Sequence, residues 1–309
     1  MSAPGQTPNS GQSAAAHAAE ARSAVSAPPQ YELVIRPTRG FASLHLADLW
    51  HYRDLLLLLV YRDFAAKYKQ TVLGPAWFIL QPLLTSVVFT VVFAGAIKIP
   101  TDGVPPILFY FTGLLGWNYF SQTFQSISGT LVNNAGIFGK VYFPRLVVPL
   151  STVVSNLMTF ALQLATMSCF WIYFKFFTAA GSQFGLSPAV VWLPLVVLQL
   201  AALSLGAGIW LSALTAKYRD FVLLSGFVVQ LWMYATPVIY PLSQIPARWR
   251  FVAVVNPLTM PVEALKYMLL GQGVVDARYT AVSVALTLLA LVSGVIVFNR
   301  VEKSFIDTV

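Results

Sequence analysis

The segment VVWLPLVVLQLAALSLGAGIWLSAL (190–214) decides the fold class. A helix needs roughly 20 apolar residues to cross the hydrocarbon core of a bilayer, and this segment is longer and carries no charged side chain. The charged sequence AKYRDF (216–221) follows it, and a second apolar run begins there. The motif YRDF also occurs at 61–64, and a close variant, YRDL, at 52–55. The triplet YRD therefore recurs at the borders of apolar runs.

The composition indicates an integral membrane protein. Of its 309 residues, 57% are hydrophobic and 10% are charged, whereas a soluble domain carries about 25% charged residues. Six runs are long enough to span a bilayer as helices, and none contains Lys, Arg, Asp, Glu or His: 75–97, 105–127, 147–174, 190–214, 221–240 and 280–298. We therefore predict an all-α integral membrane protein with six transmembrane helices.

The distribution of basic residues predicts the orientation. With the N-terminus inside the cell, the inner segments hold 13 of the 19 Lys and Arg residues, in agreement with the positive-inside rule. Both termini, including residues 301–309, are then cytoplasmic. Residues 1–43 lack the apolar core of a signal peptide, and we expect them to form a mostly disordered cytoplasmic tail.

Residues 44–70 are predicted to form an amphipathic helix in the membrane interface. At about 100° per residue, most of its charged side chains fall on the side opposite to its large rings: Asp48, Arg62, Asp63, Lys67 and Lys69. The apolar face carries Trp50, Leu57, Tyr61, Phe64 and Tyr68. Such a helix lies with its rings toward the hydrocarbon and its charges toward water. Leu55 and Leu59 fall on the polar side, and we expect them to pack against another protein surface.

Each YRD triplet suits a membrane border in the same way. In the copy Tyr61, Arg62 and Asp63, the ring fits the headgroup layer, the arginine can reach lipid phosphate and the aspartate can pair with a nearby base. A generic border motif would explain all three copies. The residues alone do not separate this reading from a role specific to this protein.

Two connections are predicted not to cross the membrane. The segment NNAGIFGKVYFPR (133–145) lies on the inner side and forms a short helix or an idle loop. The outer loop 241–273 contains two apolar pieces broken at Asn256-Pro257, and each piece is too short to span a bilayer. These pieces suit re-entrant or surface helices.

The sequence lacks the motifs of an integral enzyme. No Gly-x-x-x-x-Gly-Lys-Ser/Thr phosphate loop occurs, the three histidines precede the first predicted span, and no acidic pair stands at catalytic spacing beside a span. The predicted spans also lack the ionisable residues that proton-coupled and ion-coupled transporters place inside the bilayer. If the chain transports a solute, the energy comes from another subunit, with backbone-coordinated sodium as the alternative.

The second predicted span offers a candidate transport path. Asn118, Gln122 and Gln125 lie within about 60° of one another on a helix. Beside them stand four aromatic residues, Tyr110, Trp117, Phe120 and Phe124. Amides next to rings suit sugars, which need hydrogen bonds at their hydroxyls and flat surfaces for stacking. Gln230 and Tyr234 repeat the pattern in the fifth span. Alternatively, the amides join neighbouring helices and the rings face lipid.

Three segments in a fixed order resemble one protein family. They are VYRDFAAKYKQTVLGPAWFILQPL (60–83), NNAGIFGKVYFPR (133–145) and VVNPLTMPVEALKYMLLG (254–271). From about residue 44 to 305, the chain is similar to the membrane (permease) subunits of type-2 ABC exporters for lipid-linked polysaccharides such as O-antigen, teichoic acid or capsule. The resemblance implies a multi-pass protein of the bacterial cytoplasmic (inner) membrane, working as a homodimer in contact with membrane lipid.

The resemblance also implies partners and roles. Two copies of a cytoplasmic ABC ATPase would bind ATP and Mg, so this chain is expected to hold no cofactor, metal or catalytic residue and to bind no nucleic acid. Residues 71–300 would form the transmembrane domain, about 133–145 the coupling helix that docks on the ATPase, and about 241–273 the outer gate. The expected coupling residues are Asn133, Asn134, Gly139, Lys140, Tyr142, Phe143 and Arg145, together with Tyr61, Arg62 and Asp63 of the interface helix.

The resemblance favours ATP-driven export of a lipid-linked polysaccharide. An ABC exporter of a small lipid or drug would share the ATPase but favour a narrower, more apolar path. An ATP-independent flippase or a membrane glycosyltransferase would work without an ATPase, so co-purification of such a partner separates these readings.

Overall fold

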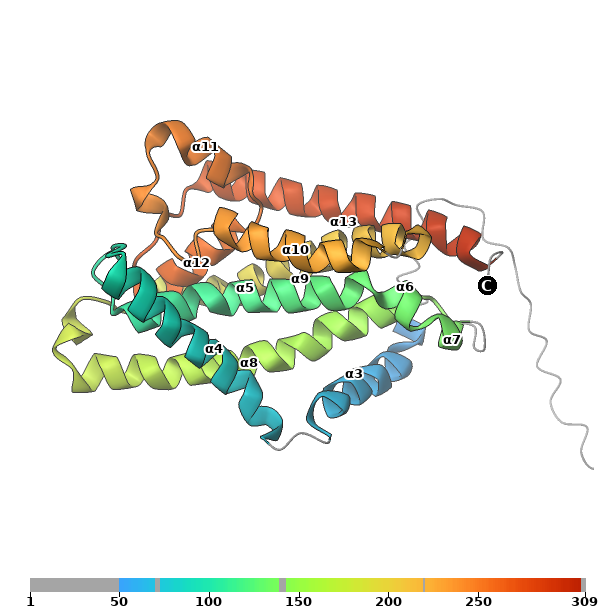
Figure 1. The fold of residues 1–309 in the computed structure, drawn as a ribbon, viewed down its shortest axis with the longest axis horizontal. Helices are drawn as coiled ribbons and strands as arrows, with labels where there is room; N and C mark the ends of the chain where they lie inside the picture. Colours follow the sequence, from blue (N-terminus) through green and yellow to red (C-terminus); the bar gives the residue numbers. More distant parts are fainter. Residues whose placement is uncertain (1–49, 70–72, 139–142, 219, 307–309) are drawn as a thin grey trace, which may run out of the picture. The chain divides into compact units, whose positions relative to one another are not determined.

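A computed structural model describes residues 50–69, 73–138, 143–218 and 220–306, which all lie in the unit Phe41–Val309. Within these ranges the fold is all helical and has no strand, as predicted (Figure 1). The helices are α3 (Arg53–Tyr68), α4 (Trp77–Phe89) continued by the π-helix η2 (Thr90–Ala96), α5 (Pro106–Ser128), α6 (Thr130–Asn133), α7 (Ala135–Phe138), α8 (Val147–Phe177), α9 (Leu193–Lys217), α10 (Asp220–Ala235), α11 (Ala247–Val255), α12 (Thr259–Leu270) and α13 (Ala277–Ile306). Short 3-10 turns stand at Gly74–Ala76, Ala179–Ser182, Pro188–Trp192 and Leu242–Gln244.

Four helical segments are long and apolar enough to cross a membrane. They are Trp77–Ala96, Val147–Phe177, Pro188–Lys217 and Ala277–Val301, and they coincide with the first, third, fourth and sixth predicted spans. The second and fifth predicted spans correspond to α5 and α10. Helix α5 has 23 residues but carries many Ser, Thr, Asn and Gln side chains, and α10 is apolar but has only 16 residues.

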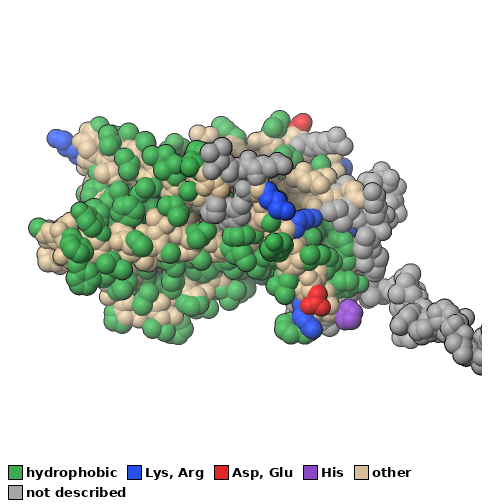
Figure 2. All heavy atoms as spheres, turned by 90° about the horizontal axis from the view of Figure 1, so that it is seen from below, with side chains coloured by type: hydrophobic (Ala, Val, Ile, Leu, Met, Phe, Trp, Pro, Cys, Tyr) green, Lys and Arg blue, Asp and Glu red, His purple; other side chains and the backbone are tan. Residues whose placement is uncertain are grey.

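The helices sort the predicted inner and outer segments to opposite ends. In Figure 1, α5, α8, α10 and α13 run along one common direction and α4 crosses them obliquely. Helices α3, α6 and α7 lie at the end where α13 finishes, which we call the inner end, and α11 and α12 lie at the outer end. Figure 2 shows hydrophobic side chains over most of the face seen there, with charges gathered mainly near α3.

Helix α5 is the centre of the bundle. Seventeen of its 23 residues are buried, and it packs against α4, α8, α9, α10 and α12. A helix that is buried on several sides can carry polar side chains inside a membrane, because those side chains face protein and not lipid. The polarity that distinguishes α5 from the other long helices therefore fits its central position.

Small residues set the closest helix contacts, as is common between helices in membranes. A Cβ atom added to Gly206 of α9 would lie 2.6 Å from the backbone of Leu291 in α13. One added to Gly294 of α13 would lie 2.5 Å from the carbonyl oxygen of Gly206. These two glycines therefore allow the backbones of α9 and α13 to touch, which a larger side chain at either position would prevent.

The first prediction concerns this crossing. Gly206→Ala should reduce the stability of the folded chain by about 1–3 kcal/mol, because the new methyl group meets backbone atoms that cannot rotate away. Gly226→Ala in α10 is the matched control, since a Cβ atom there meets nothing within 4 Å. Thermal unfolding in detergent measures both changes. Equal unfolding temperatures for the two variants would show that the α9–α13 contact is loose.

Candidate functional site

The interface helix α3 is held to the inner end by an apolar cluster. Its buried members are Leu59 of α3, Phe143 of the coupling segment 133–145, and Val147 and Val148 of α8. Tyr52, Leu55, Leu56 and Phe138 pack around them. Leu55 and Leu59, which depart from the lipid-facing pattern of α3, thus contact a protein surface as predicted, and that surface belongs to the same chain. Trp50, Leu57 and Tyr61 remain exposed on the other side.

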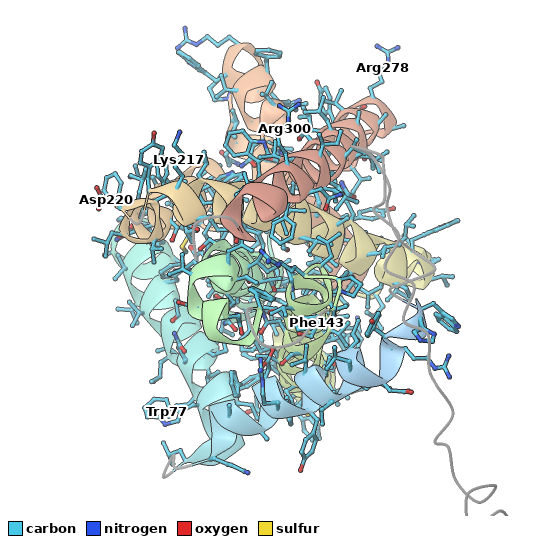
Figure 3. The ribbon with its side chains drawn as sticks, turned by 90° about the vertical axis from the view of Figure 1, so that its right-hand side faces the viewer. Trp77, Phe143, Lys217, Asp220, Arg278 and Arg300 are labelled. Atoms are coloured by element: carbon cyan, nitrogen blue, oxygen red, sulfur yellow. The ribbon has the colours of Figure 1, made fainter. Side chains whose placement is uncertain are left out.

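Aromatic contacts hold the coupling segment in place. The ring centroids of Phe138 and Phe143 lie 5.8 Å apart, and the Arg145 guanidinium lies 5.2 Å above the Phe138 ring. Arg145 is 7% exposed, so it stabilises the segment from inside and offers little surface to a partner. In the end view of Figure 3, Phe143 lies between α3 and the rest of the bundle.

The other predicted coupling residues of segment 133–145 are Asn133, Asn134, Gly139, Lys140 and Tyr142. Asn133 is exposed, and the side-chain amide of the half-buried Asn134 donates to the Thr130 carbonyl at 3.0 Å. Gly139, Lys140 and Tyr142 lie outside the described residues. The structure brings the interface helix and the coupling segment together through Leu59 and Phe143, which the sequence could not show because 83 residues separate them.

The YRD triplets on α3 form pairs between adjacent residues. Nη2 of Arg62 lies 2.8 Å from Oδ1 of Asp63, and Nε of Arg53 lies 3.8 Å from Oδ1 of Asp54. Both pairs are largely open to solvent, where an ion pair contributes only about 0–1 kcal/mol. The triplets therefore contribute little to the stability of the fold.

The third triplet joins α9 to α10. The ammonium group of Lys217 lies 5.2 Å from the centroid of the exposed Tyr218 ring. Asp220 is the first residue of α10, where a carboxylate interacts favourably with the positive end of the helix dipole. Arg219 lies outside the described residues. In this copy the acid therefore begins a helix, whereas on α3 it pairs with arginine.

The three amides of α5 lie on one side of the helix, a surface that we call the amide face: Asn118, Gln122 and Gln125. Asn118 and Gln122 are half-buried and Gln125 is exposed. Gln125 donates to the Ser121 carbonyl of its own helix at 3.2 Å. Among the described residues, none of the three side chains makes a hydrogen bond to another helix.

Other residues of α5 make its interhelical hydrogen bonds. Nδ2 of Asn156 in α8 donates to Oγ1 of Thr123 at 3.0 Å, and Oγ1 of Thr215 in α9 donates to the Ser128 carbonyl at 2.7 Å. Among the described residues, the hydrogen bonds between α5 and its neighbours therefore use hydroxyl groups and Asn156. The alternative interpretation had given this role to the amides of α5.

The four rings predicted beside the amides are buried. Tyr110, Trp117, Phe120 and Phe124 are at most 4% exposed. Phe120 stacks on Phe124 at 5.6 Å between centroids and meets Trp232 of α10 edge to face at 5.1 Å. In this arrangement the rings support the amide face from behind, and Phe124 lines a groove beside α9 and α10. Gln230 and Tyr234 of α10 are exposed.

The sequence did not predict a buried ion pair in α12, where both residues fall in the outer loop 241–273. Nζ of Lys266 lies 3.2 Å from Oε1 of Glu263, and both residues are 1% exposed. The ammonium group also donates to the Pro237 carbonyl and lies 4.0 Å from the centroid of the Phe109 ring. Burial lowers the pKa of Lys266, and the Glu263 carboxylate opposes this shift.

The pair joins α12 to three other elements. Pro237 follows α10, Phe109 belongs to α5, and the backbone N–H of Val274, which precedes α13, donates to Oε2 of Glu263 at 3.0 Å. Eleven of the 12 residues of α12 are buried. Helix α11 differs, because Trp249 and Phe251 are mostly exposed there. The i,i+3 spacing of Glu and Lys inside an apolar segment was the sequence signal for this pair.

The fold and its apolar helices define an all-α integral membrane protein, and comparison with known families makes this more specific. The model of the ABC-2 type transporter family matches residues 54–270, and the chain belongs to this family. This confirms the family resemblance carried by the three sequence segments.

Curated relatives match over nearly their whole length. An O-antigen export system permease protein RfbA from Myxococcus xanthus is 29% identical over 267 residues, which cover 85% of this chain and 98% of the relative. A protein of the same name from Klebsiella pneumoniae is 24% identical over 263 residues, which cover 84% of this chain and 96% of the relative.

The second prediction tests the buried pair. Lys266→Met should cost about 3–5 kcal/mol of folding free energy, because it leaves the Glu263 carboxylate buried without its cation. Adding Glu263→Gln should restore most of the loss, since the amide oxygen still accepts from Val274 and no charge is left buried. Lys98→Met, at an exposed lysine, is the control. A double variant no more stable than Lys266→Met would contradict this account of the pair.

Proposed function

We propose that this chain is the permease subunit of an ATP-driven exporter that moves a lipid-linked polysaccharide across the cytoplasmic membrane. The observation that carries the proposal is the uncharged amide face of α5, in a chain whose relatives are named O-antigen export permeases. The chain itself acts as a transport subunit, and ATP and Mg are bound by a separate ATPase. Six helices span the membrane, and both termini are cytoplasmic.

Six spans follow if α5 and α10 also cross. Helix α5 is long enough at 23 residues, and its polar side chains are covered by protein on most sides. Helix α10 begins at the inner end with Asp220, and the chain continues beyond Ala235 through buried residues 236–239 at the outer end. These residues extend α10 toward the length that the hydrocarbon core requires.

The amide face suits a sliding sugar chain. Amides donate and accept hydrogen bonds, so each sugar hydroxyl can exchange one partner for the next, whereas a fixed charge would hold the chain in place. One permease exposes the amide face on one side only, so a second copy placed opposite would complete the wall of a path. This supports a homodimer with an ATPase on each half.

The cluster around Phe143 supports a mechanical role for the inner end. Motion of the coupling segment reaches α3 directly, because Phe143 and Leu59 are buried against each other and against the start of α8. A docked ATPase that moves the coupling segment would therefore move the interface helix and α8 with it. In this proposal the exposed Tyr61 and Arg62, together with the half-buried Asp63, contact lipid headgroups or the ATPase as α3 moves.

At the outer end, the buried pair limits which part can open. Separating α12 from α5 would remove the Phe109 ring from the buried Lys266 ammonium group, which lies 4.0 Å from its centroid. Helix α12 therefore belongs to the fixed wall, and the more exposed α11 is the mobile part of the outer gate. The Asn256-Pro257 link between the two helices is the position at which α11 would turn.

The third prediction tests the function in cells. A strain without this chain should lose a surface polysaccharide and accumulate its lipid-linked form inside. Phe143→Leu should restore export, whereas Phe143→Asp should not, because a carboxylate disrupts the cluster that joins the coupling segment to α3. Membrane insertion of both variants is checked by immunoblot of isolated membranes.

Other outcomes of this experiment would redirect the proposal. Unchanged surface glycans with altered sensitivity to a drug would support a small-molecule exporter. Failure of the wild-type chain to co-purify with an ATPase would support an ATP-independent flippase. Full export with Phe143→Asp would refute the role of the cluster.

The fourth prediction tests the amide face. The triple variant Asn118→Leu, Gln122→Leu and Gln125→Leu should fold and dimerise normally, because none of the three amides bonds another helix of the described chain. Export should slow at least about tenfold if loss of the three amides raises the barrier to sliding by about 1.4 kcal/mol. Initial rates of surface glycan appearance give the measurement.

Gln199→Leu is a control with the reverse expectation, a loss of stability without a loss of export. Nε2 of Gln199 in α9 donates to Oγ of Ser283 in α13 at 2.8 Å, so this amide joins two helices. Its loss should lower the unfolding temperature in detergent and leave the export rate per folded molecule unchanged. A triple amide variant that is unstable but exports normally at low temperature would show that the amide face only joins subunits or helices.

A further inference from the structure

A groove outside the amide face separates α10 from α9 and α13. It encloses about 460 Å³, within the range of about 300–1,000 Å³ that is typical of small-molecule sites. Trp210 and Leu214 of α9, Phe221 and Val228 of α10, and Ala290 of α13 form much of its wall. The amide face of α5 is not part of this wall.

The wall of the groove presents few hydrogen-bonding groups to a polar ligand. Its polar side chains are Ser225 of α10 and Ser293 of α13. Oγ of Ser225 donates to the Val222 carbonyl at 2.6 Å, and Oγ of Ser293 donates to the Leu289 carbonyl at 2.6 Å. Because each hydroxyl proton is used within its own helix, the wall is chemically apolar. It therefore suits a hydrocarbon chain and not a sugar.

Basic residues stand at the inner end of the groove. Lys217 follows Leu214 by three residues in α9, and Arg300 follows Ser293 by seven in α13, so helix periodicity places both near the lining faces and beyond the groove. Figure 3 shows both on the side of the bundle away from α3, with Asp220 near Lys217. An apolar groove that ends at basic residues matches an acyl chain with a phosphate headgroup.

Among the helices that line the groove, α10 would be stabilised most by a bound acyl chain. Only Ser225 and Val229 of its 16 residues are buried, so few contacts within the chain hold it against α9 and α13. An acyl chain in the groove would pack against Phe221 and Val228 at once. Because lipid surrounds a membrane-spanning helix in any case, the gain comes from van der Waals packing and not from removing apolar surface from water. The position of α10 would then depend on lipid.

We propose that the groove binds one acyl chain of an anionic phospholipid of the inner leaflet, with the lipid phosphate at Lys217 and Arg300. The site is separate from the amide face, and it rests on the proposed function only for the orientation of the inner end. Binding to the purified chain can therefore be measured whether or not export occurs.

The test uses native mass spectrometry of the purified full chain after equilibration with vesicles of phosphatidylglycerol and phosphatidylcholine in equal amounts. The wild-type chain should retain phosphatidylglycerol in preference to phosphatidylcholine. Ser225→Leu should lower total retained lipid about tenfold, the loss that corresponds to about 1.4 kcal/mol of binding free energy, because the added side chain fills the groove. Gly226→Leu, next to it on α10 and facing open space, should retain lipid normally.

Charge variants test the headgroup contact separately. Lys217→Gln with Arg300→Gln should keep acyl-chain binding but lower the preference for phosphatidylglycerol about fivefold for each basic residue, as expected for about 1 kcal/mol of attraction to anionic lipid. Arg278→Gln, at the outer start of α13, is the matched control and should change nothing.

Three results would overturn the proposal. The first is lipid retention by Ser225→Leu equal to that of the wild-type chain. The second is loss of dimer with unchanged lipid in Ser225→Leu, which would make the groove a contact between subunits. The third is an unchanged preference for phosphatidylglycerol in the doubly neutralised variant, which would remove the headgroup site.

Discussion

The burial of α5 is the constraint on which the rest of the structure depends. Helices on several sides cover its rings and hydroxyls, and Gly116 lets Leu265 of α12 approach its backbone. A polar helix inside a membrane must place its hydrogen-bonding groups against protein or water. Because the interhelical bonds of α5 use Thr123 and Ser128, its amides are left for a surface that a second copy or a substrate would cover.

The chain uses charge differently at its two ends. At the inner end, Arg62 and Asp63 pair in the open, where the interaction is weak and easily exchanged. At the outer end, Glu263 and Lys266 are buried and contact three other elements, so the loss of either charge is costly. This contrast suits the proposed subunit driven from inside, because the end that would receive motion is held by apolar contacts that can shift, while the outer wall would stay fixed.

Periodicity and run length predicted the helical class and located the four segments that are long and apolar enough to span a membrane, and they placed helices at α5 and α10. They also identified α3 and the unusual position of Leu55 and Leu59. The sequence could not show that Phe143 packs on Leu59, because pairing between distant segments depends on three-dimensional packing. It also did not show that Lys266 is buried, since charge alone does not reveal burial. The rings of α5 were placed correctly on the helix, but their burial behind the amide face depends on Trp232 of α10.

The central claim is that the amide face of α5 borders an aqueous transport path. The most direct measurement replaces Asn118, Gln122, Gln125 and, as a buried control, Thr123 by cysteine one at a time in a Cys169→Ser background. Membranes that contain the assembled transporter are then treated with a small water-soluble thiol reagent. The account predicts modification at the three amide positions and protection at Thr123. Protection of all three amide positions, or equally fast modification of Thr123, would contradict it.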